Sequence, residues 1–311
     1  MGRGADSGAR RAVDGVLLFD KPAGATSNAV LQRIKRLYRA RKAGHTGTLD
    51  PMATGLLPIC FGEASKFGAG LIDSDKAYRA RLQLGVRTDS GDREGTVLET
   101  RPVAVSAEML DAALARFRGE IEQTPPMYSA LKRDGKPLYE YARAGVVLER
   151  RARAVTIHAL TLIGFAPPFV EIEVVCSKGT YIRTLAEDIG GVLGCGAHLT
   201  QLRRLRVGPF DVAEAADWDA LESLDDRARD CLLRPVDCLV AAYPEVHLDA
   251  AGEALVKQGR TLPLRLAPAG PVRLYGVGGR FLGVGEQAAD GALRPSRLLR
   301  GDEFSATVRK S

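Results

Sequence analysis

AGHTGTLDPMATGLLP, residues 43–58, is the stretch around which the rest of the chain is organised. It holds three glycines, two prolines and three threonines, which is too punctuated for a helix and too rich in Gly and Pro for a long strand. We therefore expect a structured loop that presents His45 and Asp50 and then enters a short buried strand over residues 56–61.

Local features of this loop suggest a functional site. Pro51 biases Asp50 towards an extended backbone and favours a turn. Gly44 and Gly47 let the backbone lie close to a ligand. The alternative is an ordinary turn in which Asp50 caps the next segment, and the residues of the loop alone leave both interpretations open.

Composition and charge describe a globular protein. The 311 residues are 45% hydrophobic and 26% charged, and no apolar run approaches the ~20 residues of a membrane helix. A formal net charge of +6 suggests an anionic partner, although many proteins without one are equally basic. Five scattered cysteines without a CxxC pair indicate reduced thiols in a cytoplasmic protein and argue against a zinc site.

The segment before the loop combines a strand with a basic helix. Residues 15–22 read as a buried strand ending at a Lys-Pro turn, where Lys21 either faces the site or solvates the strand end. Thr26 or Ser27 then caps a helix whose exit, residues 33–42, is almost wholly positive. Because this run leads into the loop, we expect it to contact phosphates rather than form only a solvated face.

Three further segments carry candidate site features. Residues 76–86 alternate as a half-buried strand with Tyr78 on its inner side, where plain core packing is the alternative role. The acidic loop 88–95 lacks the spacing of a calcium site. Residues 124–143 interleave three tyrosines with Lys and Arg, which suits an RNA-gripping insertion or, equally, a surface hairpin without a partner.

The second half of the chain predicts two strands, a helix and a C-terminal hairpin. Strands over 154–165 and 169–176 precede a helix with Arg183 in its first turn, where the helix dipole disfavours a cation. That placement suggests a dedicated carboxylate or phosphate partner. Residues 211–239 look helical, and Gly-Gly between two short strands near residue 278 indicates a hairpin in a small β-rich domain.

The central motif, GHTGTLDPMATGLLPICFGEASKF, resembles the catalytic motif of the TruB family of tRNA pseudouridine synthases. Other motifs of that family follow the same order over about residues 14–210: GVLLFDKPAGATS, DKAYRARLQLGVRTDSGDREG, TPPMYSALKRDGKPLYEYAR, SKGTYIRTLAEDIG and LRRLRVGPF. Several motifs in one order make the resemblance specific, whereas GHTG alone would not.

The resemblance implies an α+β fold. It implies a pseudouridine synthase catalytic domain over residues 13–243, with a mixed, mostly antiparallel sheet flanked by helices and loops and an RNA-gripping insertion at about 124–152. A small β-rich, PUA-like RNA-binding domain would follow over 245–307. The first twelve residues match nothing in the family pattern, and we expect them to form a disordered basic tail.

The resemblance also implies the reaction. Asp50 takes the position of the catalytic nucleophile, and the reaction isomerises uridine 55 in the T-loop of tRNA to pseudouridine after flipping the base, without cofactor or metal. Arg183 would pair with Asp50 and hold its pKa down. Tyr78 matches the tyrosine that stacks on the flipped uracil, and His45 matches the histidine that fills the disrupted RNA loop.

The remaining matched positions support the base and the loop. Tyr181 and Leu202 match residues that line the base pocket, and Lys21 matches a lysine that supports the catalytic loop. The expected partner is tRNA, held by its T-arm and acceptor end. We expect a monomer acting in the cytoplasm without guide RNA or membrane.

Two other functions compete with this one. An RNA-binding or tRNA-folding protein would use the same basic and aromatic surfaces without needing catalysis. A carbohydrate glycosidase would also place an Asp in a Gly-rich loop, but that chemistry usually needs a second carboxylate. The motif offers no evident acidic partner for Asp50, because Glu63 lies in a predicted helix.

Overall fold

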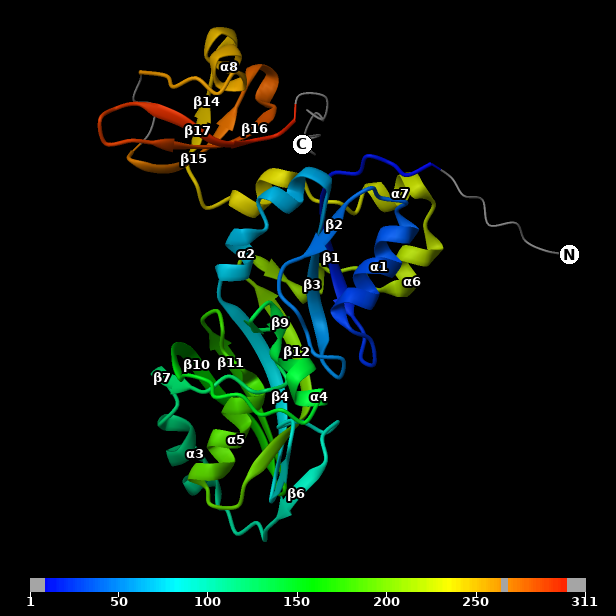
Figure 1. The fold of residues 1–311 in the computed structure, drawn as a ribbon, viewed down its shortest axis with the longest axis vertical. Helices are drawn as coiled ribbons and strands as arrows, with labels where there is room; N and C mark the ends of the chain where they lie inside the picture. The colour runs from blue at the N-terminus through cyan, green and yellow to red at the C-terminus, as the bar shows by residue number, and fades with distance from the viewer. Residues whose placement is uncertain (1–8, 264–267, 301–311) are drawn as a thin grey trace, which may run out of the picture.

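The computed structural model describes residues 9–263 and 268–300, which form a large sheet with helices and a smaller C-terminal sheet (Figure 1). None of the helices in those ranges has the length and apolar character needed to cross a membrane. The fold is therefore the α+β architecture that the sequence predicts, with a separate β-rich C-terminal unit.

The large sheet has nine strands. Seven of them lie side by side in the order β1 (Gly15–Lys21), β3 (Thr54–Phe61), β12 (Ala197–Val207), β4 (Lys76–Leu84), β11 (Phe169–Cys176), β10 (Arg153–Ala166) and β7 (Gly119–Gln123). The other two are β2 (Ala43–His45), which pairs with β3, and β13 (Phe210–Asp211), which pairs with β12. Every pairing is antiparallel except that of β3 with β12, so the expected mixed, mostly antiparallel sheet is confirmed.

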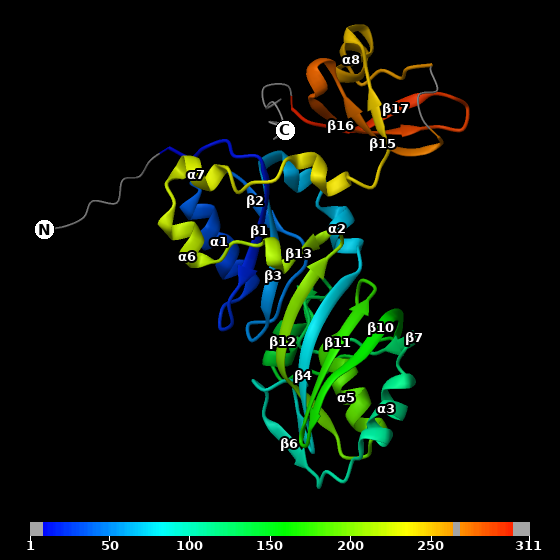
Figure 2. The same cartoon turned by 180° about the vertical axis from the view of Figure 1, so that it is seen from behind.

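Helices cover one face of the half of the sheet that runs from β4 to β7. Figure 1 shows α3 (Ala107–Ala115) and α5 (Ile182–Val192) together there, and Figure 2 shows the strands in front of them from behind. Ala80 and Leu82 of β4 point into the shared core, whereas Arg79 on the opposite face pairs with Glu173 of β11. The predicted alternation of this strand is therefore confirmed.

The basic helix packs beside β1 at the other end of the sheet. Thr26 caps α1 (Ser27–Leu37) by accepting a hydrogen bond from the Ala29 amide at 3.1 Å. Val30 and Ile34 are buried against the core that β1 and β3 share. Figure 1 places α6 (Trp218–Ser223) and α7 (Asp226–Asp230) next to this helix.

Several predicted elements are shorter than expected. The helix predicted to contain Glu63 consists of a 3₁₀ turn, η1 (Gly62–Lys66), and the single-turn α2 (Ala69–Asp73). The region 211–239 is divided among η2 (Val212–Glu214), α6, α7 and η3 (Val236–Val240). Short β-hairpins are formed by β5 (Val86–Thr88) with β6 (Val97–Thr100), and by β8 (Lys132–Arg133) with β9 (Lys136–Pro137). The latter hairpin and α4 (Leu138–Arg143) lie within residues 124–152, where we expect the insertion.

The expected disordered tail is wrong for its last residues. The Arg11 amide donates to the Arg39 carbonyl at 2.8 Å, and the Arg41 amide donates to the Arg11 carbonyl at 3.1 Å. The Arg11 guanidinium also forms an ion pair with Asp230. These bonds fix Arg11 against the segment that follows α1, while the expectation for residues 1–8 lies outside the described part of the chain.

The C-terminal unit is a four-stranded sheet with one helix. Its strands are β14 (Glu245–His247), β15 (Gly270–Tyr275), β16 (Phe281–Gln287) and β17 (Leu293–Leu298), and α8 (Ala250–Lys257) follows β14. The predicted hairpin is confirmed: Gly278 and Gly279, which lie in η4 (Val277–Gly279), have φ of 76° and 73° between β15 and β16.

The two units are in contact. Phe281 packs edge-on against Phe67 with ring centroids 5.6 Å apart, and the Arg300 amide donates to the Glu63 carboxylate at 2.8 Å. Both partners come from the segment that follows β3. The C-terminal unit therefore contacts the segment directly after β3, the strand that the central loop enters.

Candidate active site

The loop between β2 and β3 is held by a turn of its own backbone, by hydrogen bonds to Ser27 and by the burial of Leu49. The Asp50 carbonyl accepts the Ala53 amide at 3.1 Å, which closes a turn. The Ser27 hydroxyl, at the start of α1, accepts the Leu49 amide at 2.8 Å and donates to the Leu49 carbonyl at 3.0 Å. Because Leu49 is buried in the core, the adjacent Asp50 has a fixed position. The predicted structured loop is present.

Arg183 forms the ion pair that the sequence predicts for it. Its Nε lies 2.9 Å from Oδ2 of Asp50, and its Nη2 lies 3.2 Å from Oδ1, so the guanidinium grips both carboxylate oxygens. The guanidinium also donates to the Ser90 carbonyl at 3.1 Å and to the Tyr128 carbonyl at 2.6 Å. These bonds offset the unfavourable helix dipole at the start of α5.

A second carboxylate shares this arginine. Oδ2 of Asp92 lies 3.7 Å from the Arg183 Nε, and the Asp92 side chain is only 7% exposed. Its Oδ1 accepts bonds from the Ser90 hydroxyl at 2.6 Å and from the Glu94 amide at 3.0 Å. Sequence reasoning missed Asp92, because the loop 88–95 was considered only as a calcium site.

The expected effect of Arg183 on the Asp50 pKa needs correction. Burial raises the pKa of the Asp50 carboxyl above its ordinary value, and the charge of Asp92 raises it further. The Arg183 charge and hydrogen bond, with a smaller contribution from Lys21, oppose this rise without overcoming it. The ion pair is therefore present, but the carboxyl ionises above the usual range rather than below it.

Lys21 lies beneath the loop. Its side chain is fully buried at the end of β1, and its ammonium donates to the Pro22 carbonyl at 2.8 Å and the Pro51 carbonyl at 3.3 Å. Burial lowers the pKa of Lys21 to about 8, although the nearby Asp50 charge opposes this. The expectation that Lys21 faces the loop is therefore supported by its bond to the residue after Asp50.

Tyr78 and Arg204 are opposite neighbours on β4 and β12. Burial raises the pKa of the half-buried Tyr78, while the charge of Arg204 opposes that rise. Arg204 itself is 1% exposed, and sequence reasoning gave it no role. Arg204 is one of three arginines within residues 202–206, and nothing in the sequence distinguishes it from the other two as buried.

His45 lies half-buried at the end of β2. Burial and, to a lesser extent, the Arg204 charge lower its pKa, so the ring stays neutral at physiological pH. Its Nδ1 is buried without a hydrogen-bond partner among the described residues. A neutral ring of this kind suits stacking better than a cationic role.

Tyr181 and Leu202 lie on different elements near the loop. Gln123 holds the Tyr181 backbone by two bonds, accepting its amide at 3.0 Å and donating to its carbonyl at 3.3 Å. Leu202 on β12 lines a cavity of about 300 Å³ together with Met52 and Thr54 of the loop exit. The structure thus places Leu202 beside the loop, and Tyr181 two residues before Arg183.

Comparison with known proteins identifies the family. Residues 35–182 match the TruB family pseudouridylate synthase N-terminal domain, and 183–241 match the tRNA pseudouridylate synthase B C-terminal domain. Residues 244–299 match the C-terminal domain of pseudouridine synthase II TruB. The chain belongs to the TruB family of pseudouridylate synthases. The fold and family that the sequence motifs suggest are thereby confirmed.

Curated relatives of this TruB-family chain match it over nearly its full length. The tRNA pseudouridine synthase B of Aromatoleum aromaticum is 59% identical over 290 residues, covering 93% of this chain and 94% of the relative. The protein of the same name from Burkholderia mallei is 57% identical over 298 residues, covering 94% of this chain and 98% of the relative.

Solved structures share the fold at lower identity. A chain in the crystal structure of a Cbf5-Nop10-Gar1 complex is 24% identical, with a TM-score of 0.72, covering 97% of this chain and 92% of that chain. A chain in the structure of an H/ACA RNP bound to a substrate RNA containing 2'-deoxyuridine is 22% identical, with a TM-score of 0.69, covering 97% and 93% of the two chains. These similarities support the architecture of the TruB-family sheet.

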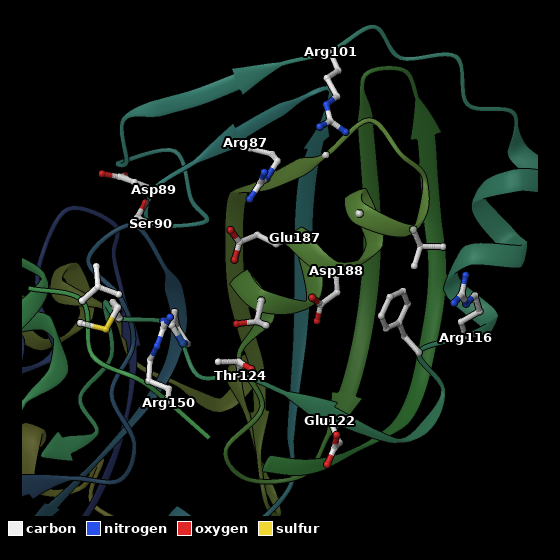
Figure 3. Close-up of a pocket in the computed structure, with 18 residues that line it drawn as sticks. Arg87, Asp89, Ser90, Arg101, Arg116, Glu122, Thr124, Arg150, Glu187 and Asp188 are labelled. Atoms are coloured by element: carbon white, nitrogen blue, oxygen red, sulfur yellow. The ribbon is translucent and has the colours of Figure 1, made fainter. Parts of the chain in front are cut away.

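A larger cavity adjoins the site without containing Asp50. It has a volume of about 1000 Å³ and lies between α5, the root of the insertion and β5 (Figure 3). Glu187 and Asp188 of α5 lie near its centre, with Arg87 beside Glu187. Burial raises the pKa of both carboxyls. The candidate site is therefore defined by the Asp50–Arg183 contact and not by the size of this cavity.

Proposed function

We propose that this TruB-family enzyme converts uridine 55 in the T-loop of tRNA to pseudouridine, with Asp50 as the nucleophile. The observation that carries the proposal is the carboxylate of Asp50, fixed in a rigid loop and gripped on both oxygens by Arg183. The printed names of the curated relatives, tRNA pseudouridine synthase B, support tRNA as the substrate.

The arrangement suits the reaction. Isomerisation breaks the N-glycosidic bond, rotates the uracil and rejoins it to the ribose through carbon, so nothing is gained or lost overall. A carboxylate beside the sugar–base unit can attack or stabilise the developing positive charge. Because Arg183 holds Asp50 by two contacts, the carboxylate is oriented before the substrate arrives.

The substrate base must leave the RNA stack to reach Asp50. We propose that Tyr78 stacks on the flipped uracil, that Tyr181 and Leu202 line its pocket, and that His45 occupies the space left in the RNA loop. The neutral His45 ring, with its low pKa, fits this stacking role. Lys21 would support the loop from below through its bond to Pro51.

Part of the basic helix is available to RNA phosphates. Arg33 and Arg39 are neutralised by Glu222 and Asp226, so they contribute less than the sequence suggests. Four other cations of this region form no ion pair with any residue that the structure describes: Lys35, Arg36, Arg41 and Lys42. We propose that these cations, the insertion and a PUA-like C-terminal unit hold the T-arm and acceptor end.

We further propose that the chain acts as a cytoplasmic monomer without guide RNA. The insertion that begins after Gln123 is the feature that supports recognition of a free tRNA. The first part of this insertion also contacts the site, since the Tyr128 carbonyl accepts a hydrogen bond from Arg183. RNA contacts by the insertion would therefore be close to the catalytic pair.

The glycosidase alternative is weakened by the state of Asp92. A paired carboxylate is present after all, but its Oδ1 accepts two bonds and its side chain is 7% exposed. A general acid or base must reach the substrate. Asp92 instead faces Arg183, so it acts on Asp50 only through that cation.

The test is pseudouridine mapping by mass spectrometry on T-arm transcripts and full tRNA. Asp50→Asn should abolish product formation while the tRNA affinity changes less than about twofold, because removing one carboxylate charge leaves the RNA contacts in place. Asp111→Asn, an exposed change on α3, is the matched control. Product formed by Asp50→Asn would overturn the nucleophile. Binding by the wild-type protein without any product would favour the RNA-folding function, and sugar release without RNA activity would favour a glycosidase.

A further inference from the structure

Arg204 is a buried cation with no carboxylate partner in the described part of the chain. Its side chain is the largest of those that are almost fully buried, and it contacts main-chain carbonyls instead. Nε donates to the Leu56 carbonyl at 2.7 Å, and Nη2 donates to the Gly47 carbonyl at 3.1 Å. Buried cations are normally paired with an anion, so this arrangement calls for an explanation.

The two carbonyls lie on either side of the nucleophile. Gly47 precedes Asp50 in the loop, and Leu56 follows it at the start of β3. One guanidinium therefore holds both ends of the segment that presents Asp50. A planar guanidinium fixes such a geometry better than a single ammonium group, because its donors form a rigid fork.

The backbone of Arg204 is equally constrained. It lies between Gly55 of β3 and Tyr78 of β4, at the parallel junction of the sheet. A Cβ on Gly55 would lie 2.2 Å from the Arg204 carbonyl oxygen, and Gly55 has a φ of 101°. Only glycine allows the two strands to approach this closely.

Arg204 is also the cross-strand partner of Tyr78, the residue proposed to stack on uracil. Its charge acts on the Tyr78 hydroxyl and opposes the rise in pKa that burial causes there. Its charge also acts on His45 and Lys21, the other groups next to the loop. Arg204 thus holds both ends of the loop through its side chain and pairs with Tyr78 across the two strands.

We propose that Arg204 is a positioning residue that sets the separation between the Asp50 loop and the Tyr78 ring. Removing it would let the loop and β4 move independently while the RNA-binding surface stays intact. The proposal rests on the function proposed above, because it assigns Arg204 a part in the same reaction.

The first measurement is the single-turnover rate of pseudouridine formation, with tRNA affinity measured in parallel. Arg204→Gln should lower the rate about 10²-fold, the usual effect of misplacing a catalytic group by about 1 Å, and change the tRNA Kd less than about twofold. Arg204→Lys keeps the charge but lacks the rigid fork that holds the Leu56 and Gly47 carbonyls together. It should restore part of the rate.

A double variant tests the connection to Tyr78. If Arg204 acts partly through the Tyr78 hydroxyl, the fold loss in rate of the double variant Tyr78→Phe/Arg204→Gln should be clearly smaller than the product of the fold losses of the two single variants. Arg206→Gln, an exposed change on the same strand, is the control for lost positive charge and should keep the wild-type rate.

Thermal unfolding separates positioning from loss of fold. If Arg204→Gln does not fold, Arg204→Lys decides, and a native-like Tm with an unchanged rate overturns the proposal. A Gln variant within about threefold of the wild-type rate, or a fully multiplicative double variant, overturns it as well. Wild-type protein that forms no pseudouridine would instead refute the proposed function itself.

Discussion

Replacing Arg183 by Gln tests how the Asp50 carboxylate is kept ionised. The wild-type guanidinium lies 2.9 Å and 3.2 Å from the two oxygens of Asp50, whose pKa burial already raises. Without the Arg183 cation, Lys21 is the remaining described group whose charge opposes the rise in the Asp50 pKa, and its contribution is smaller. The Asp50 pKa should therefore rise further, and the active ionised form should be lost at a higher pH.

The magnitude follows from the contacts. An adjacent arginine lowers a carboxyl pKa by about 1 to 3 units, and here the buried Arg183 makes two contacts with a half-buried carboxylate. We expect the acidic limb of the rate–pH profile to move up by about that amount. The maximal rate should also fall by about 10²-fold or more, because the carboxylate loses its orientation.

The assay is single-turnover pseudouridine formation between about pH 5 and 9, where the carboxyl titrates. Arg183→Lys, which keeps a charge without the fork, should shift the limb less than Arg183→Gln does. A rate that falls equally at every pH, with an unmoved acidic limb, would refute the electrostatic part of the reasoning. Thermal unfolding of both variants controls for loss of the bonds to Ser90 and Tyr128.

Three other substitutions probe the surroundings of the nucleophile. Asp92→Asn removes a charge that raises the Asp50 pKa, so in the same pH series its acidic limb should move down, opposite to Arg183→Gln; an upward shift would contradict this. Gly55→Ala should cost about 2 to 4 kcal/mol in urea unfolding, since its Cβ would clash with Arg204, and a loss below about 1 kcal/mol would refute the close approach. Lys21→Met should flatten the pH dependence of stability. Between the folded pKa of about 8 and the ordinary value of 10.5, the unfolded wild-type chain binds more protons, so wild-type stability rises there by about 2 to 3 kcal/mol in urea unfolding and the variant should lack that rise.

The main chain of the site could be predicted because its signals are local. Gly and Pro marked the loop, alternation marked β4, and the cap residue Thr26 marked α1. Arg183 was found for a different reason. Its position in the first turn of α5 is locally unfavourable, which pointed to a specific partner in the fold.

The residues that were missed act only through tertiary contacts. Asp92 belongs to a loop whose sequence resembles ordinary acidic loops, and its relation to Arg183 arises when that loop packs on α5. Arg204 lies on β12 between the partly exposed Arg203 and the exposed Arg206, and the neighbouring strands bury it. The same holds for Arg11, whose pairing with Asp230 joins residues 219 positions apart.

The direction of the net pKa shift of Asp50, which depends on burial as well as on nearby charges, could not be predicted from the sequence either. Proximity to Arg183 predicts a lowered pKa for Asp50, but the sign of the net shift depends on how much protein surrounds the carboxyl. That quantity is a property of packing. The correction changes the expected role of the arginine: it limits an unfavourable rise in pKa and orients the carboxylate, rather than producing an unusually acidic group.

The position of the site follows from the single parallel pairing in the sheet. Where β3 meets β12, the loop that precedes β3 is brought next to Arg204 and, one strand further, to Tyr78. The carboxylates Asp50 and Asp92 and the cations Lys21, Arg183 and Arg204 around this junction sum to one positive charge when Lys21 is protonated. Because an excess of positive charge favours an anionic partner, this balance suits the RNA substrate proposed above.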